Sequence, residues 1–184
     1  MVILMGKSGA GKTTVLNELV KLGFKKAVTC TTRPVRPGER DGVDYHFLTA
    51  EKFEEMESAG MFAETAHTGK HAYGSLKESY MDAATVIILT PDGAENTVRR
   101  VGRKNMLAVY LYADKKLLIK RLKERGDDPK EFMRRLAEDD ARFEKAYEFC
   151  DYCVRQNERT DAAQTAVLIS WLAPLKGGAK DEAS

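Results

Sequence analysis

The chain has 184 residues, enough for one domain with a hydrophobic core. Its 30 basic and 28 acidic residues leave a net charge of +2, which argues against a general nucleic-acid or membrane surface, so any anion site should be local. Apolar runs fall short of the roughly 20 residues that span a bilayer, and the first residues, M-V-I-L-M, lack the basic region of a signal peptide. Three cysteines, Cys30, Cys150 and Cys153, suit a reducing compartment, and we expect a cytoplasmic protein.

The first predicted elements are a buried strand at Val2–Met5 and a helix over Thr13–Leu22, joined by a glycine-rich loop. This loop, residues 6–13, reads G-K-S-G-A-G-K-T and matches the phosphate-loop pattern G-x-x-x-x-G-K-[ST] at every specified position. Backbone N–H groups in such a loop approach an anion, while Lys12 can reach the β- and γ-phosphates and the Thr13 hydroxyl can ligate Mg²⁺. The alternative is a turn that only closes a β-α unit; the strand before and the helix after favour a nucleoside triphosphate site. The predicted contacts are Gly6, Ser8, Gly9, Ala10, Gly11, Lys12, Thr13 and Thr14.

Apolar runs alternate with helical patterns along the rest of the chain, which favours an α/β domain with a mostly parallel sheet flanked by helices. The predicted strands are Val2–Met5, Ala27–Cys30, Thr85–Thr90, Met106–Tyr112 and Tyr152–Arg155. Residues 1–30, 84–114 and 149–174 are expected to form the core, and 175–184 a flexible tail. Cys150 and Cys153 have C-x-x-C spacing, but their predicted place between a helix and a strand favours structural thiols over a redox or zinc site.

Residues 31–83 interrupt this alternation with shorter elements. The stretch contains Tyr45-His46-Phe47, a helix over Ala50–Ser58 and a strand at Met61–His67. We therefore expect a small, partly antiparallel insertion.

Residues 115–148 form a second interruption, which is long and heavily charged. Asp114 is predicted to cap a helix over Lys115–Arg125, Gly126 ends it, and Asp128-Pro129 begins another. Two charged helices joined in this way predict a mobile lid.

The loop over residues 31–47 reads T-T-R-P-V-R-P-G-E-R-D-G-V-D-Y-H-F. The guanidinium groups of Arg33 and Arg36 suit a doubly charged phosphate, and Tyr45 can add a hydroxyl. A solvated basic turn is the alternative, and the loop by itself does not decide between the two.

The two motifs together resemble the guanylate kinase family. G-x-S-G-x-G-K-[ST] is followed about twenty residues later by T-T-R-x-x-R-x-G-E-x-x-G-x-x-Y-x-F. Phe62-Ala63-Glu64 and Tyr73-Gly74-Ser75 resemble the family's F-x-E and Y-G-[ST], and the arginine-rich 121–126 segment resembles its lid. The resemblance covers residues 1 to about 170 and implies a P-loop NTPase-like fold.

The resemblance implies a kinase that transfers the γ-phosphoryl group of ATP, bound with Mg²⁺, to GMP. It places Arg33, Arg36, Tyr45 and Tyr73 at the GMP phosphate, with Gly74 beside them. It places Thr29, Glu64 and Ser75 at the guanine, and Asn157 near the adenine. It surrounds the transferred phosphoryl group with Lys12, Arg121, Arg125 and Arg135.

The chemistry of two of these assignments agrees with the residues themselves. Guanine presents N1–H and the N2 amino group as adjacent donors, which a carboxylate such as Glu64 can accept together. Arg121 and Arg125 are four residues apart, so one helical face carries both. Without the phosphate loop, an exposed strand charge and a solvated helix face would be the preferred interpretations.

The chain departs from the family at Thr90-Pro91-Asp92, where the family usually carries D-x-D or E-x-D. Asp92 is expected either to contact GMP, or Mg²⁺ through water, or to cap a helix over Gly93–Val101. The departure leaves open a kinase of the same fold that acts on another phosphorylated acceptor, such as a ribose phosphate. A non-catalytic module that binds a phosphorylated protein is the second alternative, although the intact phosphate loop disfavours it. The oligomeric state cannot be predicted.

Overall fold

The computed structural model describes residues 1–68, 70–80, 82–103 and 106–177. Its main sheet has five strands, and every pair of neighbours runs parallel, as the alternating pattern predicted. Across the sheet, the strands are β2 (Lys25–Lys26), β7 (Thr85–Ile88), β1 (Val2–Met5), β8 (Leu107–Ala113) and β9 (Tyr152–Gln156). The almost wholly apolar sequences of β1 and β8 are those of strands buried on both faces.

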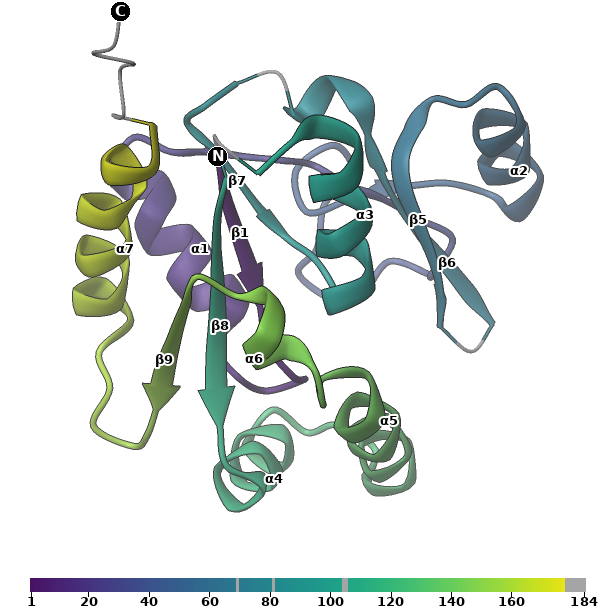
Figure 1. Cartoon of the computed structure of the whole chain (residues 1–184). Helices are drawn as coiled ribbons and strands as arrows, with labels where there is room; N and C mark the ends of the chain where they lie inside the picture. The colour runs from purple at the N-terminus through teal and green to yellow at the C-terminus, as the bar shows by residue number, and fades with distance from the viewer. Residues whose placement is uncertain (69, 81, 104–105, 178–184) are drawn as a thin grey trace, which may run out of the picture.

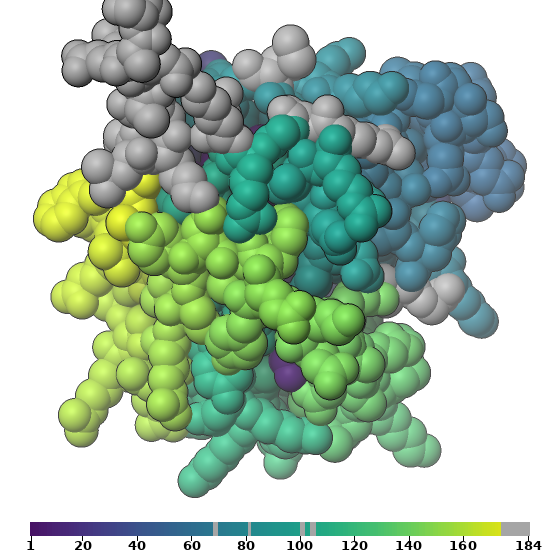
Figure 2. Space-filling view, in the orientation of Figure 1, coloured from purple at the N-terminus to yellow at the C-terminus, as the bar shows by residue number. Residues whose placement is uncertain are grey.

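Two hydrophobic clusters lie on opposite faces of this sheet, because alternate residues of a strand point to opposite sides. Val2 and Leu4 belong to one cluster, and Ile3 and Met5 to the other. The first cluster includes residues of α1 (Lys12–Lys21), α4 (Lys115–Glu124), α5 (Pro129–Arg142) and α7 (Ala162–Gly177). The second includes residues of α3 (Pro91–Val101) and α6 (Ala146–Phe149). Figure 1 shows α1 and α7 side by side, and little of the purple N-terminal segment is visible in Figure 2.

The insertion forms a second, mixed sheet, as predicted. Its strands, in order, are β4 (His46–Phe47), β3 (Cys30–Thr31), β6 (His71–Leu76) and β5 (Phe62–Thr68), with β3 parallel to β4 and the other pairs antiparallel. Helix α2 (Ala50–Ser58) and the short helix η1 (Lys77–Tyr80) complete it. The predicted strand Ala27–Cys30 is wrong, because the chain leaves the main sheet after Lys26 and enters the second sheet at Cys30.

The structure contains the residues predicted to begin and end the two helices of the lid, residues 115–148. Asp114 accepts a 2.9 Å hydrogen bond from the Leu117 N–H at the start of α4, and Asp128 accepts one of 2.8 Å from the Glu131 N–H at the start of α5. Gly126 follows α4 with a φ of 78°, a conformation that side chains other than glycine disfavour. The termini of both helices therefore follow from local sequence.

The lid helices also contribute to the core. Leu118 and Leu122 of α4 and Leu136 of α5 are buried in the same cluster as strand β1, and the movement of this stretch stays a prediction. Helix α7 continues to Gly177, so residues 175–177 of the expected flexible tail are helical, and residues 178–184 lie outside the described residues. Within the described part of the chain, every helix is too short or too polar to cross a membrane.

Candidate active site

Two cavities open beside the phosphate loop. The insertion cavity, of about 550 Å³, is lined mainly by the second sheet and α5, and the loop cavity, of about 530 Å³, mainly by the phosphate loop, α1 and α4. The two cavities meet at residues that line both, which are Ser8, Lys12, Tyr45, Ile88 and Arg135. Figure 1 shows β1, β8 and β9 pointing toward the end where α4 and α5 lie, and ligands of open α/β sheets gather at the carboxyl ends of the strands.

The phosphate loop has the backbone that its glycines predicted. Gly9 and Gly11 have φ values of 83° and 91°, which other residues rarely adopt. A Cβ at Gly6 would lie 2.8 Å from the carbonyl oxygen of Leu111, so only glycine lets the loop approach β8 this closely. Ala10 is fully buried and supports the loop from inside. The predicted contacts that line the loop cavity are Ser8, Gly9, Gly11, Lys12, Thr13 and Thr14, and Gly6 lines the insertion cavity.

Lys12 lies where the cavities meet and is turned back onto the loop. Its Nζ donates to the carbonyl oxygens of Gly6 at 2.6 Å and Lys7 at 3.0 Å. Burial lowers the pKa of Lys12 to about 8; the negative charge of Asp139 opposes this shift, and the positive charge of Arg125 adds to it. A buried ammonium group is costly without an anion, so Lys12 is placed to stabilise a negatively charged ligand from either cavity.

Arginines from three elements surround this junction. Arg121 and Arg125 line the loop cavity together, which confirms that one face of the α4 segment carries both, and Arg36 joins them from the insertion. Burial, followed by the positive charges of Arg33 and Arg135, lowers the pKa of Arg36. The insertion and the lid thus bring like charges together at a place where a polyphosphate would neutralise them.

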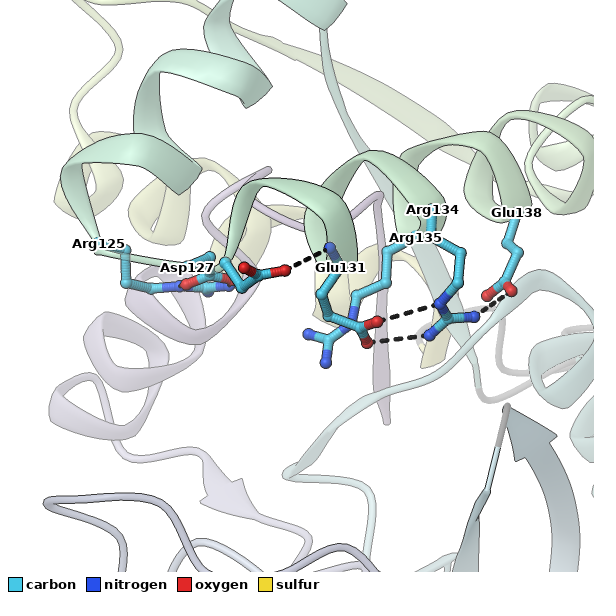
Figure 3. Close-up of polar contacts among 7 residues, drawn as sticks. Arg125, Asp127, Glu131, Arg134, Arg135 and Glu138 are labelled. Atoms are coloured by element: carbon cyan, nitrogen blue, oxygen red, sulfur yellow. Dashed lines mark hydrogen bonds and ion pairs between the residues drawn. The ribbon is translucent and has the colours of Figure 1, made fainter.

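Carboxylates of the lid bind two of these arginines (Figure 3). Arg125 Nε donates at 2.6 Å to Asp127 Oδ1, and Arg135 Nε donates at 2.8 Å to Glu131 Oε1. Arg134 binds the same Glu131. Hydrogen bonds from Arg134 and Arg135 lower the pKa of Glu131 to about 2, so this carboxylate stays ionised at neutral pH.

A buried carboxylate distinguishes the insertion cavity. Glu64 on β5 is 6% exposed, and its Oε1 accepts a 2.5 Å hydrogen bond from the hydroxyl of Ser75 on β6. Its Oε2 lies near the start of α3, where a Cβ at Gly93 would be 2.9 Å away, and a helix N-terminus favours a negative charge. The predicted acceptor residues that line this cavity are Thr29, Arg33, Tyr45, Glu64, Tyr73, Gly74 and Ser75.

Glu39 organises the basic loop, a role that the sequence analysis did not assign. Its Oε1 accepts a 2.9 Å hydrogen bond from Arg33 Nη2, and its Oε2 accepts one of 2.9 Å from the backbone N–H of Arg36. The Arg33 guanidinium lies over the Tyr45 ring, 5.4 Å from its centroid. Arg33 is buried and lines the insertion cavity, whereas residues 34–38 of the same loop are exposed, so one end of the loop forms a wall of the site and the rest faces solvent. The Arg36 side chain lines the loop cavity instead of the insertion cavity.

Thr90, and not Asp92, is the side chain of its turn that reaches the site. Helix α3 begins at Pro91, and the Thr90 hydroxyl caps it by accepting a 3.2 Å hydrogen bond from the Gly93 N–H. The alternative of a cap at Asp92 is therefore wrong, because the helix begins two residues before the predicted start. Thr90 lines the insertion cavity and Ile88 lines both cavities, whereas Asp92 is exposed. Asp92 lines neither of these two cavities, so the structure does not support its predicted contact with GMP or Mg²⁺.

Gln156 lines the loop cavity at the position that the sequence analysis gave to Asn157. Asn157 instead holds a turn: its Oδ1 accepts a 2.7 Å hydrogen bond from the Arg159 N–H, and its N–H donates at 2.8 Å to Thr160 Oγ1. Gln156 is 4% exposed, and its Nε2 has no hydrogen-bond partner among the described residues. Ile88 and Gln156 are the last residues of two parallel strands. Ligands gather at the carboxyl ends of such strands, so this position could have identified both as site residues.

Comparisons with known proteins agree with this geometry. The family model described as guanylate kinase matches residues 1–168. A guanylate kinase of Aster yellows witches'-broom phytoplasma is 35% identical over 179 residues, covering 92% of this chain and 84% of the relative. One from Frankia casuarinae is 36% identical over 181 residues, with 92% and 96% covered. The crystal structure of guanylate kinase from Anaplasma phagocytophilum shares the fold, with a TM-score of 0.72 at 22% identity over 98% of this chain and 87% of that one.

The affinity for ATP is expected to fall as the pH rises above about 8. Burial lowers the pKa of Lys12 to about 8 in the empty protein, so the ammonium charge is present below that pH and is lost above it. Between pH 7.5 and 9.5, calorimetric titration should show affinity weakening on the order of tenfold. Lys12→Met should bind weakly at both values, and a pH-independent affinity of the unmodified protein would contradict this role.

Gln156→Leu should weaken ATP binding by roughly tenfold, the scale of one lost hydrogen bond to the ligand. Its thermal stability should not fall, because the substitution removes a buried donor that has no partner. Asn157→Leu serves as the matched control and should lose stability while keeping ATP affinity. If Asn157→Leu weakened ATP binding in calorimetry and Gln156→Leu lowered only the melting temperature, Asn157 and not Gln156 would contact the nucleotide.

Proposed function

The chain belongs to the guanylate kinase family, and we propose that it transfers the γ-phosphoryl group of ATP to GMP, producing ADP and GDP. As a member of this family it is a nucleoside monophosphate kinase. The observation that carries the proposal is the meeting of two cavities at Lys12, one lined by an intact phosphate loop and the other by the buried Glu64–Ser75 pair.

In this proposal ATP occupies the loop cavity. The loop N–H groups and Lys12 hold its phosphates, and Gln156 faces the nucleotide from the end of β9. Among the described residues, no cluster of three or more histidine, cysteine or acidic side chains could hold a metal. Mg²⁺ does not need such a cluster, because it binds chiefly through phosphates and waters. The Thr13 hydroxyl is its proposed protein ligand. The metal would neutralise charge on the phosphates.

GMP occupies the insertion cavity. Glu64 accepts the guanine N1–H and N2 amino donors, and Ser75 orients that carboxylate. Arg33 and Tyr73 bind the acceptor phosphate near the junction, and Tyr45 lies against both side chains. The acceptor phosphate then points toward Lys12.

Phosphoryl transfer depends on positioning and charge neutralisation more than on covalent chemistry. Lys12 and Arg135 line both cavities, so each can contact the phosphoryl group before and after transfer. Arg121 and Arg125 approach from the ATP side. Stabilising the charge that spreads over the transferred oxygens is their common role.

A ribose phosphate acceptor would leave the buried Glu64 without a base to recognise, so the insertion cavity supports GMP better. A non-catalytic module has no use for a phosphate loop that retains Lys12 and Thr13. We place this activity in the cytoplasm, since a chain with the three cysteines Cys30, Cys150 and Cys153 suits a reducing compartment.

A coupled assay of ADP release tests the proposal, with ATP, Mg²⁺ and an acceptor panel of GMP, AMP, UMP, CMP and ribose 5-phosphate. Turnover is expected with GMP and only weakly with the others. Glu64→Gln should raise the KM for GMP by roughly ten- to a hundredfold, because the amide presents a donor to the guanine donors.

The same variant should leave ATP binding unchanged, which separates loss of base recognition from general damage to the site. Equal turnover of GMP and AMP by the unmodified protein would refute the assignment of the acceptor. Unchanged discrimination in Glu64→Gln would show that Glu64 does not face the base.

A further inference from the structure

Helix α5 contacts the phosphate loop through two adjacent carboxylates. The backbone N–H of Ser8 donates a 2.8 Å hydrogen bond to Asp139 Oδ2, and Lys7 Nζ donates one of 2.6 Å to Asp140 Oδ1. Consecutive loop residues thus bind consecutive residues of one helix, across more than 130 positions of sequence. The Lys7 ammonium lowers the pKa of Asp140, so that carboxylate remains charged.

The Asp139 contact uses a donor of the kind that binds phosphate. A phosphate loop works by presenting backbone N–H groups to phosphate oxygens, and here the Ser8 N–H already has a charged oxygen acceptor. Lys12 is likewise engaged, since its Nζ donates to Gly6 O and Lys7 O. Both donors therefore have acceptors within the protein.

We propose that Asp139 competes with the phosphates of the nucleotide for the phosphate loop. Its carboxylate takes the place of a phosphate oxygen at the Ser8 N–H, and the nucleotide binds by displacing it. Ser8 lines both cavities and Asp139 lines the insertion cavity, so this inference rests on the proposed function only in assuming that polyphosphate in the loop cavity reaches the Ser8 N–H. Because α5 also carries Arg135, displacement of Asp139 links nucleotide arrival to the position of a guanidinium that lines both cavities.

The negative charge of Asp139 has opposite effects in the protein without ligand and in the protein with polyphosphate bound. In the empty protein, the negative charge of Asp139 offsets part of the cost of burying the Lys12 ammonium. When a polyphosphate is present, the same carboxylate repels it and occupies one of its donors. Removing Asp139 should therefore destabilise the empty protein and tighten polyphosphate binding. A residue with a purely structural role would weaken both.

Calorimetric titration with inorganic pyrophosphate tests this, because pyrophosphate needs neither acceptor nor turnover. Asp139→Ala is expected to bind pyrophosphate roughly tenfold more tightly than the unmodified protein, the effect of losing one charge-assisted hydrogen bond that competes with the ligand. Its melting temperature without ligand should be lower. Glu138→Gln is the matched control: it removes the same charge one residue away, from a carboxylate that binds Arg134, and should leave pyrophosphate affinity unchanged.

Equal or weaker binding by Asp139→Ala would overturn the proposal, and so would equal tightening by Glu138→Gln, which would reduce the effect to net charge. Should Asp139→Ala not fold, hydrogen exchange of the unmodified protein decides instead. The Ser8 amide should be protected in the empty protein, and rapid exchange there would overturn the proposal. A protein that binds pyrophosphate as described but does not phosphorylate GMP would refute the proposed function alone.

Discussion

The site depends on an excess of positive charge that is gathered at one point, at Lys12 and the arginines around it. Lys12 is half-buried where two cavities meet, and Arg36 and Arg135 line these cavities from the insertion and the lid. Burial and mutual repulsion of these cations would oppose folding of the empty protein. Carboxylates at Glu39, Asp127 and Glu131 offset that repulsion and orient the guanidinium groups that they bind, and the negative charge of Asp139 acts on Lys12.

Sheet topology explains why this charge gathers at a single point. The phosphate loop follows β1, the central strand, and the neighbouring strands β7 and β8 end beside it. Ile88 at the end of β7 and the α4 and α5 helices after β8 therefore converge on Lys12. The second sheet supplies the opposite wall, with Glu64 and Ser75 placed together by the pairing of β5 with β6.

Local patterns were sufficient to predict much of this site. The phosphate loop, the caps Asp114 and Asp128, and the separation of core and insertion all follow from short-range chemistry. Predictions failed where a position depended on one residue of register: Gln156, not Asn157, lines the cavity, and Thr90, not Asp92, caps α3. Asp139 could not be predicted, because its contact with Ser8 joins residues 131 positions apart and only tertiary folding brings them together.

In the proposed function the two cavities form one site, with Lys12 between its halves. Calorimetric titration with a single molecule in which five phosphates join adenosine to guanosine tests this arrangement. If the cavities form one site, one molecule should bind per chain, at least a hundredfold more tightly than ADP or GMP, on the order of the gain from linking two ligands, and should exclude both nucleotides. Binding no tighter than that of ADP, with GMP still able to bind beside it, would contradict the claim.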